Sequence, residues 1–123
     1  MNENNHNPRR VVVTGMGMVT ALGNDVETTW KNLLAGKSGV TRLWRFDPAR
    51  FAVQIAAQLD GFKIEDYGEY IDFKEARRID PFIQLAVACT AQALKQANLK
   101  IDESNADDIG VVIGSGIGGV NTI

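Results

Sequence analysis

The sequence predicts an α/β fold in which a largely parallel sheet is layered with helices. Two β-branched apolar runs, residues 10–14 and 111–113, are typical of strands with both faces buried, because neither run alternates with polar residues. Between them lie two helical patterns, one from Asn24 to Gly36 and one from Asp80 to Asn98. Strands that alternate with helices favour a parallel sheet over an antiparallel one.

Composition narrows the class of protein. The chain has 123 residues, and its 13 basic and 15 acidic residues give a net charge of −2, so no overall field favours nucleic acid or an anionic membrane. A single cysteine excludes an internal disulfide. Residues 1–8 are polar and Asn-rich, predict a disordered tail with a solvated His6, and lack the apolar segment of a secretory signal. We therefore expect a cytoplasmic protein.

The first predicted strand, Arg10–Thr14, leads into a glycine-rich segment. Gly15 and Gly17 have the start of a dinucleotide-binding spacing, but Thr20 stands where the third glycine is required. We interpret these two glycines as positions where a neighbouring element approaches the backbone closely.

The first helix has a clear start and end in the sequence. Asn24 is the predicted N-cap, and Glu27 three residues later completes a capping box. Gly36 is the expected left-handed residue after the helix. One apolar face, which we expect to pack in the core, comprises Val26, Trp30, Leu33 and Leu34.

The central part of the chain is less regular. Residues 51–59 alternate partly and predict an edge strand, whereas residues 60–72 carry five acids and predict a surface loop. The next stretch, 72–82, contains Lys74, Arg77 and Arg78. Two interpretations stay open from the residues alone: a solvated turn with local ion pairs, or a basic patch for an acidic partner.

The second helix is predicted to be buried. Asp80 is a suitable N-cap, Pro81 suits the first helical position, and Asn98 suits the C-terminal end. The residues of this helix are small or apolar on nearly all of its faces, which predicts close packing against neighbouring elements. Cys89 lies about eight residues into this helix, far from the positive end of the helix dipole and among apolar neighbours, and the one histidine is in the tail, so we expect an inert thiol.

The stretch DIGVVIGSGIGGV, residues 108–120, places Gly114, Gly116 and Gly119 at the spacing of a dinucleotide-binding turn. An FAD- or NAD-binding oxidoreductase is therefore one alternative. That motif requires a following helix and an acid about 20 residues later, and the sequence printed here contains neither.

Three stretches together resemble one family: RRVVVTGMGMVTALGNDVETTWKNLLAGKSGV, RRIDPFIQLAVACTAQALKQANL and IGVVIGSGIGGV. They resemble the β-ketoacyl-[acyl-carrier-protein] synthases, and the form of the glycine loop is closer to type II. The resemblance implies the N-terminal part, residues 9–123, of a thiolase-like fold with α/β/α/β/α layers, incomplete and truncated in this chain. It also implies a homodimer that elongates acyl chains by decarboxylative Claisen condensation, with acyl carrier protein as partner and no cofactor or metal.

The resemblance also assigns roles to individual residues. Ile117 would line the acyl pocket, and Lys74, Arg77 and Arg78 would contact the acidic carrier protein. The family's nucleophilic cysteine and two histidines have no counterpart in these residues, so we expect no condensing activity from the 123-residue chain alone. A non-catalytic chain-length-factor subunit of the same fold, and a short interaction module, are the remaining alternatives.

Overall fold

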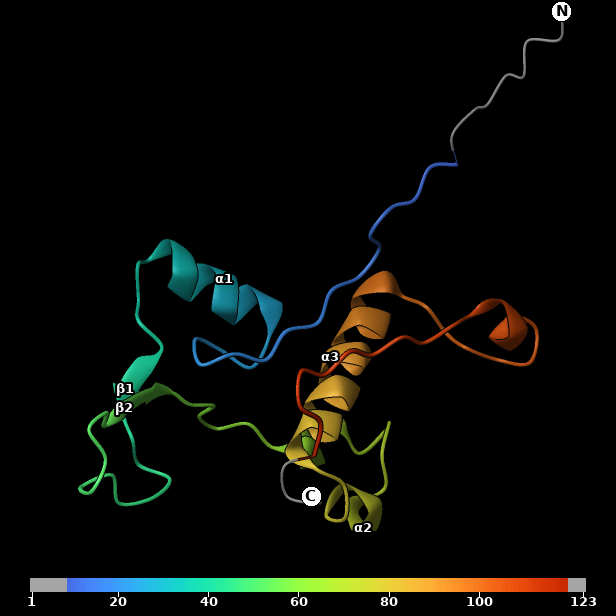
Figure 1. The fold of residues 1–123 in the computed structure, drawn as a ribbon. Helices are drawn as coiled ribbons and strands as arrows, with labels where there is room; N and C mark the ends of the chain where they lie inside the picture. The colour runs from blue at the N-terminus through green and yellow to red at the C-terminus, as the bar shows by residue number, and fades with distance from the viewer. Residues whose placement is uncertain (1–8, 120–123) are drawn as a thin grey trace, which may run out of the picture.

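The computed structural model describes residues 9–119, so the predicted tail at residues 1–8 lies outside the described residues. A long helix occupies the centre, a helix and a small hairpin lie to one side, and the segment before the glycine loop lies to the other (Figure 1). The elements in chain order are α1 (Val26–Leu34), β1 (Val40–Arg42), β2 (Ile55–Ala57), the 3₁₀ turn η1 (Ile64–Tyr67), α2 (Phe73–Ala76), α3 (Pro81–Ala97) and the 3₁₀ turn η2 (Ala106–Asp108).

Helix α3 forms as the sequence predicts. Asp80 occupies the N-cap position, although its side chain makes no capping hydrogen bond. Pro81 is the first helical residue, and Asn98 ends the helix in the left-handed conformation with φ of 50°. The Leu99 N–H then donates to the carbonyl of Leu94, which closes the helix with a Schellman-type bond. Burial is less complete than expected: Ala88 and Ala91 are buried, but most other apolar side chains of α3 are half-buried.

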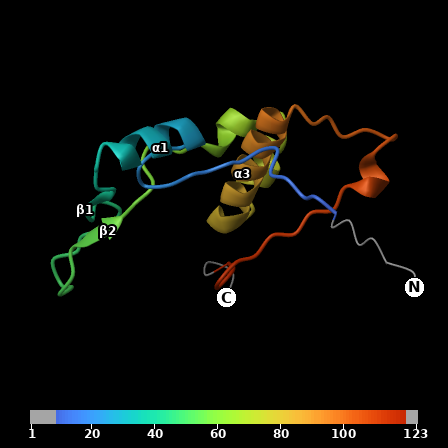
Figure 2. The ribbon, with the colours of Figure 1, turned by 90° about the horizontal axis from the view of Figure 1, so that it is seen from above.

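The segment that follows residue 14 packs directly on α3, as the glycine interpretation predicted. A Cβ atom on Gly15 would overlap the carbonyl oxygen of Ala93, and one on Gly17 would overlap that of Cys89. Two glutamine side chains of α3 complete the contact: Gln96 Oε1 accepts the Met16 N–H at 2.6 Å, and Gln92 Oε1 accepts the Met18 N–H at 2.9 Å. Figures 1 and 2 show this segment running along α3 before it turns into α1.

The N-cap of α1 is one residue later than predicted. Asp25, and not Asn24, accepts the Thr28 N–H at 2.7 Å, and this bond lowers the pKa of the Asp25 carboxyl. Asn24 is used differently, because its side-chain amide donates to the carbonyl of Asp60. The predicted end is confirmed: Gly36 has φ of 65°, and Lys37 N–H donates to the Asn32 carbonyl in a Schellman motif.

The predicted core face of α1 is wrong. Trp30 is 58% exposed, and Leu33 and Leu34 are exposed as well. The buried residue of the helix is Thr29, whose hydroxyl donates to the Gly23 carbonyl and bonds the Thr20 hydroxyl. Amphipathic spacing identifies an apolar face, but only a packed neighbour makes that face a core, and α1 makes its inward contacts through threonine.

The predicted parallel sheet does not form among residues 9–119. Their one sheet is the antiparallel pair of β1 and β2, in which Val40 lies opposite Ala57 and Arg42 opposite Ile55. The edge strand predicted within residues 51–59 is thus confirmed over three residues. Its partner β1 was not predicted, because the short mixed sequence VTR has no alternation.

The two buried strands predicted for residues 10–14 and 111–113 are not formed either. Both segments have an extended course (Figure 1), but neither pairs with a strand among the described residues. Their side chains are exposed, to the extent of 97% for Val112. A strand needs the hydrogen bonds of a neighbour, and a β-branched sequence supplies only the preference for an extended backbone.

Residues 60–76 contain the 3₁₀ turn η1 and the short helix α2, and η1 packs against α3. The predicted surface loop contains η1, whose Ile64 is buried, and Tyr67 hydrogen-bonds to α3 through its hydroxyl. Asp72 then caps α2 by accepting the Lys74 N–H at 2.8 Å, and Ala76, the last residue of α2, is buried. These contacts fix the short helix α2 immediately before α3.

Candidate functional site

The basic turn, which we define as Lys74, Arg77 and Arg78, is exposed in the structure. Lys74 lies on α2, Arg77 is its C-cap, and Arg78 follows before α3 begins. The Arg77 guanidinium lies 5.6 Å from the ring centre of the exposed Phe73, a cation–π contact. The structure therefore places all three predicted residues on one short segment, with their charged groups accessible to a partner.

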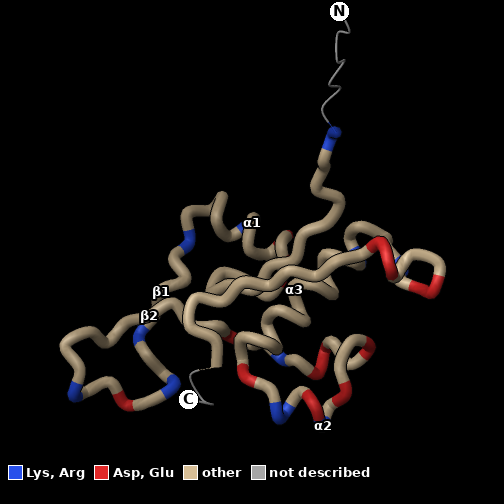
Figure 3. The backbone as a smooth tube through the Cα atoms, turned by 45° about the vertical axis from the view of Figure 1, so that its right-hand side comes forward, with Lys and Arg blue, Asp and Glu red and all other residues tan. Residues whose placement is uncertain are grey.

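Acidic residues reduce the charge of this segment. Residues 72–80 contain three bases and three acids, namely Asp72, Glu75 and Asp80. Asp80 is buried at the start of α3, and Asp72 uses one carboxylate oxygen to cap α2. Figure 3 shows this mixture of charges around α2. The exposed excess of positive charge on the basic turn is thus small, and any docking there would be sensitive to charges nearby.

In the glycine loop, residues 114–119, the Gly118 N–H donates to the Ser115 hydroxyl at 3.0 Å, and Gly118 has φ of 80°. Ile117 is 76% exposed on this loop. A cavity of about 270 Å³ lies between α3 and the start of the loop. It is lined by Phe82, Leu85, Ala86, Cys89, Thr90, Ile113, Gly114 and Ser115. Ile117 does not line this cavity, so its role in an acyl pocket stays a prediction.

Cys89 lines the same cavity from α3. Burial raises the pKa of its thiol, and a hydrogen bond from the backbone of Val19 opposes that rise. A thiol of raised pKa stays protonated near neutral pH, and the thiolate is the nucleophile. The prediction that Cys89 is inert is therefore supported by its surroundings in the fold.

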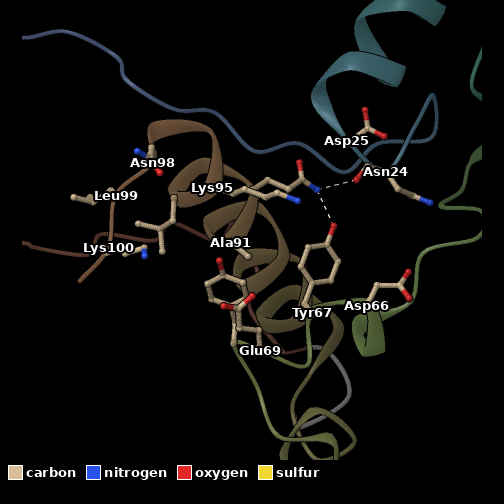
Figure 4. Close-up of a pocket in the computed structure, with 13 residues that line it drawn as sticks. Asn24, Asp25, Asp66, Tyr67, Glu69, Ala91, Lys95, Asn98, Leu99 and Lys100 are labelled. Carbon is tan, nitrogen blue, oxygen red and sulfur yellow. Dashed lines mark hydrogen bonds between the residues drawn. The ribbon is translucent and has the colours of Figure 1, made fainter. Parts of the chain in front are cut away.

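A larger cavity, of about 560 Å³, was not predicted from the sequence (Figure 4). Its walls come from the two residues before α1, from residues 66–70 and from the C-terminal half of α3 with residues 98–100. Gln92 crosses it, donating to the Asn24 carbonyl and to the Tyr67 hydroxyl, both at 2.8 Å. Its lining mixes acids, lysines and tyrosines and includes no serine, cysteine or histidine. Because residues from three separate stretches of the chain line this cavity, no single sequence motif predicts it.

Neither a metal-binding cluster nor a membrane-spanning helix is found in the described part of the chain. Within residues 9–119, no cluster of three or more His, Cys, Asp or Glu side chains is placed to bind a metal ion. In the same part of the chain, no helix has the length and apolar character needed to cross a membrane.

Comparison with known proteins places these features in context. Residues 8–123 match the family described as "Beta-ketoacyl synthase, N-terminal domain". The chain is 50% identical over 114 residues to 3-oxoacyl-[acyl-carrier-protein] synthase 2 of Staphylococcus aureus (strain COL), covering 93% of this chain and 27% of that protein. It is 49% identical over 115 residues to the synthase 2 of Vibrio cholerae, covering 94% of this chain and 27% of that protein.

A solved structure has the same fold over most of the chain. It is described as "The ishigamide ketosynthase/chain length factor", with a TM-score of 0.66 and 30% identity, over 83% of this chain and 23% of that one. The chain thus spans about a quarter of the length of the relatives it matches. It is homologous to the N-terminal part of a 3-oxoacyl-[acyl-carrier-protein] synthase 2, and the match leaves the dinucleotide-binding interpretation of the glycine loop without support.

Proposed function

Because the chain belongs to the β-ketoacyl synthase N-terminal domain family, we propose that it forms part of a type II 3-oxoacyl-[acyl-carrier-protein] synthase. The observation that carries this proposal is the 50% identity over 93% of the chain. The reaction elongates a fatty acyl chain carried by an acyl carrier protein.

The proposed reaction has two bond-forming steps. A cysteine thiolate attacks the acyl thioester, the acyl group moves to the cysteine sulfur, and the carrier protein leaves as its thiol. Malonyl carrier protein then loses CO₂, and the resulting carbanion attacks the acyl-cysteine carbonyl. The carbon–sulfur bond to the enzyme breaks, which regenerates the cysteine and releases 3-oxoacyl carrier protein. Two histidines polarise the malonyl thioester, and backbone N–H groups stabilise the developing oxyanion.

In the proposed reaction, the residues of this chain bind the carrier protein and the acyl chain. The basic turn would meet the carrier protein, and Ile117 would form part of the acyl-pocket wall. Catalytic groups would come from elsewhere in the enzyme, because the one cysteine of these 123 residues has a raised pKa and the one histidine is His6. We propose that the 123-residue chain alone does not catalyse condensation.

The same family membership leads us to propose the architecture of the complete enzyme. The exposed apolar segments at residues 10–14 and 111–113 would pair with further strands in a thiolase-like α/β/α/β/α arrangement, as a homodimer. Their exposure is consistent with this, since contiguous apolar surface of this kind is usually covered by a partner.

A second candidate is a chain-length-factor subunit, which shares the fold but does not perform condensation. The observation that favours it is the structural match to a ketosynthase/chain length factor. Both subunit types would use this N-terminal segment, so the two candidates differ in the catalytic cysteine and not in these residues.

The first prediction concerns the basic turn in the complete synthase. Replacing Lys74, Arg77 and Arg78 together with alanine should raise KM for carrier-protein substrates about tenfold, since three exposed charges of about 0.5 kcal/mol each sum to about 1.5 kcal/mol. The measurement is steady-state kinetics with acyl carrier protein and, in parallel, with a small acyl thioester. The small thioester should react at the wild-type rate. An equal loss on both substrates would show that the variant damages the enzyme in general and that the basic turn is not a docking site.

A further inference from the structure

We propose that Arg45, on the hairpin lobe, forms one docking surface with the basic turn and contacts the acidic carrier protein from the opposite side of the α3 N-terminus. The hairpin lobe is residues 37–59, which include β1 and β2. This inference rests on the proposed function, because it names a further contact for the same partner.

The first support is position. Arg45 lines a cavity of about 490 Å³ together with Pro81, Gln84 and Leu85 from the first turns of α3. The basic turn ends three residues before Pro81 in the chain. Arg45 is 36 residues away in sequence from that proline, yet the fold brings it to the same end of α3. A partner seated on the basic turn would therefore lie close to the Arg45 guanidinium.

The second support is charge. The hairpin lobe contains four bases, Lys37, Arg42, Arg45 and Arg50, against one acid, Asp47, which leaves a net charge of +3 on a chain whose total is −2. Figure 3 shows the lobe as mainly basic, in contrast to the mixed charges around α2. Residues 72–80 are neutral overall. Positive charge for an acidic partner must therefore come partly from outside the basic turn, and Arg45 is the lobe base that lines the cavity beside it.

The third support is the state of the Arg45 side chain. Its guanidinium lies 5.5 Å from the ring centre of Trp44, which is 57% exposed. A cation–π contact of this kind restricts the side chain and leaves the edge of the guanidinium free to donate hydrogen bonds. Arg77 on the basic turn has the same arrangement over Phe73. Both sides of the proposed surface thus present an arginine on an exposed aromatic ring, which lowers the entropy cost of binding a carboxylate.

The occupant follows from this chemistry. Arg45 in the cavity wall and the arginines of the basic turn, near the same end of α3, suit a protein surface with clustered carboxylates, which is what the proposed carrier-protein substrate would present. Rim charges act mainly on the encounter rate and on its salt dependence.

The test uses Arg45→Ala in the complete synthase. At low salt we expect kcat/KM for acyl carrier protein to fall about three- to fivefold, with no change for a small acyl thioester. At 1 M salt, where the Debye length is about 3 Å, the difference should disappear. Arg45→Lys should restore most of the low-salt rate. Arg50→Ala is the matched control, because it removes one charge from the same lobe at a residue that does not line the cavity; its effect should stay below twofold.

Failure of the inference and of the proposed function are distinguishable. If the basic-turn triple variant loses carrier-protein activity selectively while Arg45→Ala equals Arg50→Ala, only the role of Arg45 is overturned. If neither variant distinguishes carrier protein from the small thioester, the docking surface itself is overturned. A loss with Arg45→Ala that persists at 1 M salt or that affects both substrates would indicate a structural role and would also contradict the proposal.

Discussion

Gly17→Ala should destabilise the fold by about 2–3 kcal/mol, because the added Cβ would overlap the carbonyl group of Cys89 on α3. The contact is between two backbones, so no side-chain rotation relieves it. Either α3 or the segment around Gly17 must move, and such a movement breaks the neighbouring bond between Met18 N–H and Gln92. The measurement is the urea midpoint of the complete protein, with the denaturant slope checked for constancy.

Gly68→Ala is the matched control, because it makes the same chemical change at an exposed residue. Gly68 has φ of −60°, and the nearest atom to an added Cβ lies at an ordinary distance of 3.5 Å. Its stability should be unchanged or slightly increased, since alanine loses less backbone entropy on folding than glycine. Equal effects of the two substitutions would show that the approach of this segment to α3 is not tight.

Gln92→Leu is the second substitution with a large expected effect, about 2–3 kcal/mol of stability. The Gln92 side chain makes three hydrogen bonds: it accepts from Met18 N–H and donates to the Asn24 carbonyl and the Tyr67 hydroxyl. Leucine keeps the volume and leaves these groups without their partner. Partly buried polar groups that lose a hydrogen bond cost about 1–3 kcal/mol each, with solvent compensating where it reaches them.

Gln96→Leu controls for the loss of a glutamine on the same helix. Gln96 lies one turn later, is exposed, and makes a single side-chain bond, to the Met16 N–H. Its loss should cost about 1 kcal/mol or less. A Gln92 variant as stable as the Gln96 variant would contradict the view that Gln92 holds the segment before α1, η1 and α3 together.

Local signals predicted the helices well. Proline at the first turn of α3, left-handed Gly36 and Asn98, and the close approach at Gly15 and Gly17 all depend on a few adjacent residues, and the structure confirms them. The cap of α1 shifted by one residue because Asn24 and Asp25 are both suitable caps. The Asn24 side chain instead donates a hydrogen bond to the carbonyl of Asp60, a contact between distant residues that the local sequence does not predict.

Signals that depend on distant partners failed. The valines of residues 11–13 indicate an extended backbone, but their burial requires a neighbouring strand that residues 9–119 do not provide. Trp30 was assigned to the core for its spacing alone, and it is exposed because α1 packs through Thr29. Arg45 lies in a stretch without any motif, and its position beside the start of α3 is a product of the fold.

The measurement that tests the account most directly is condensation by the complete protein. Purified enzyme is given acyl carrier protein loaded with a labelled acyl chain, together with malonyl carrier protein, and both CO₂ and the labelled 3-oxoacyl product are quantified. We predict equal amounts of CO₂ and of 3-oxoacyl carrier protein. Decarboxylation without elongation would indicate a subunit of the chain-length-factor type, and the absence of both products would contradict the proposed synthase.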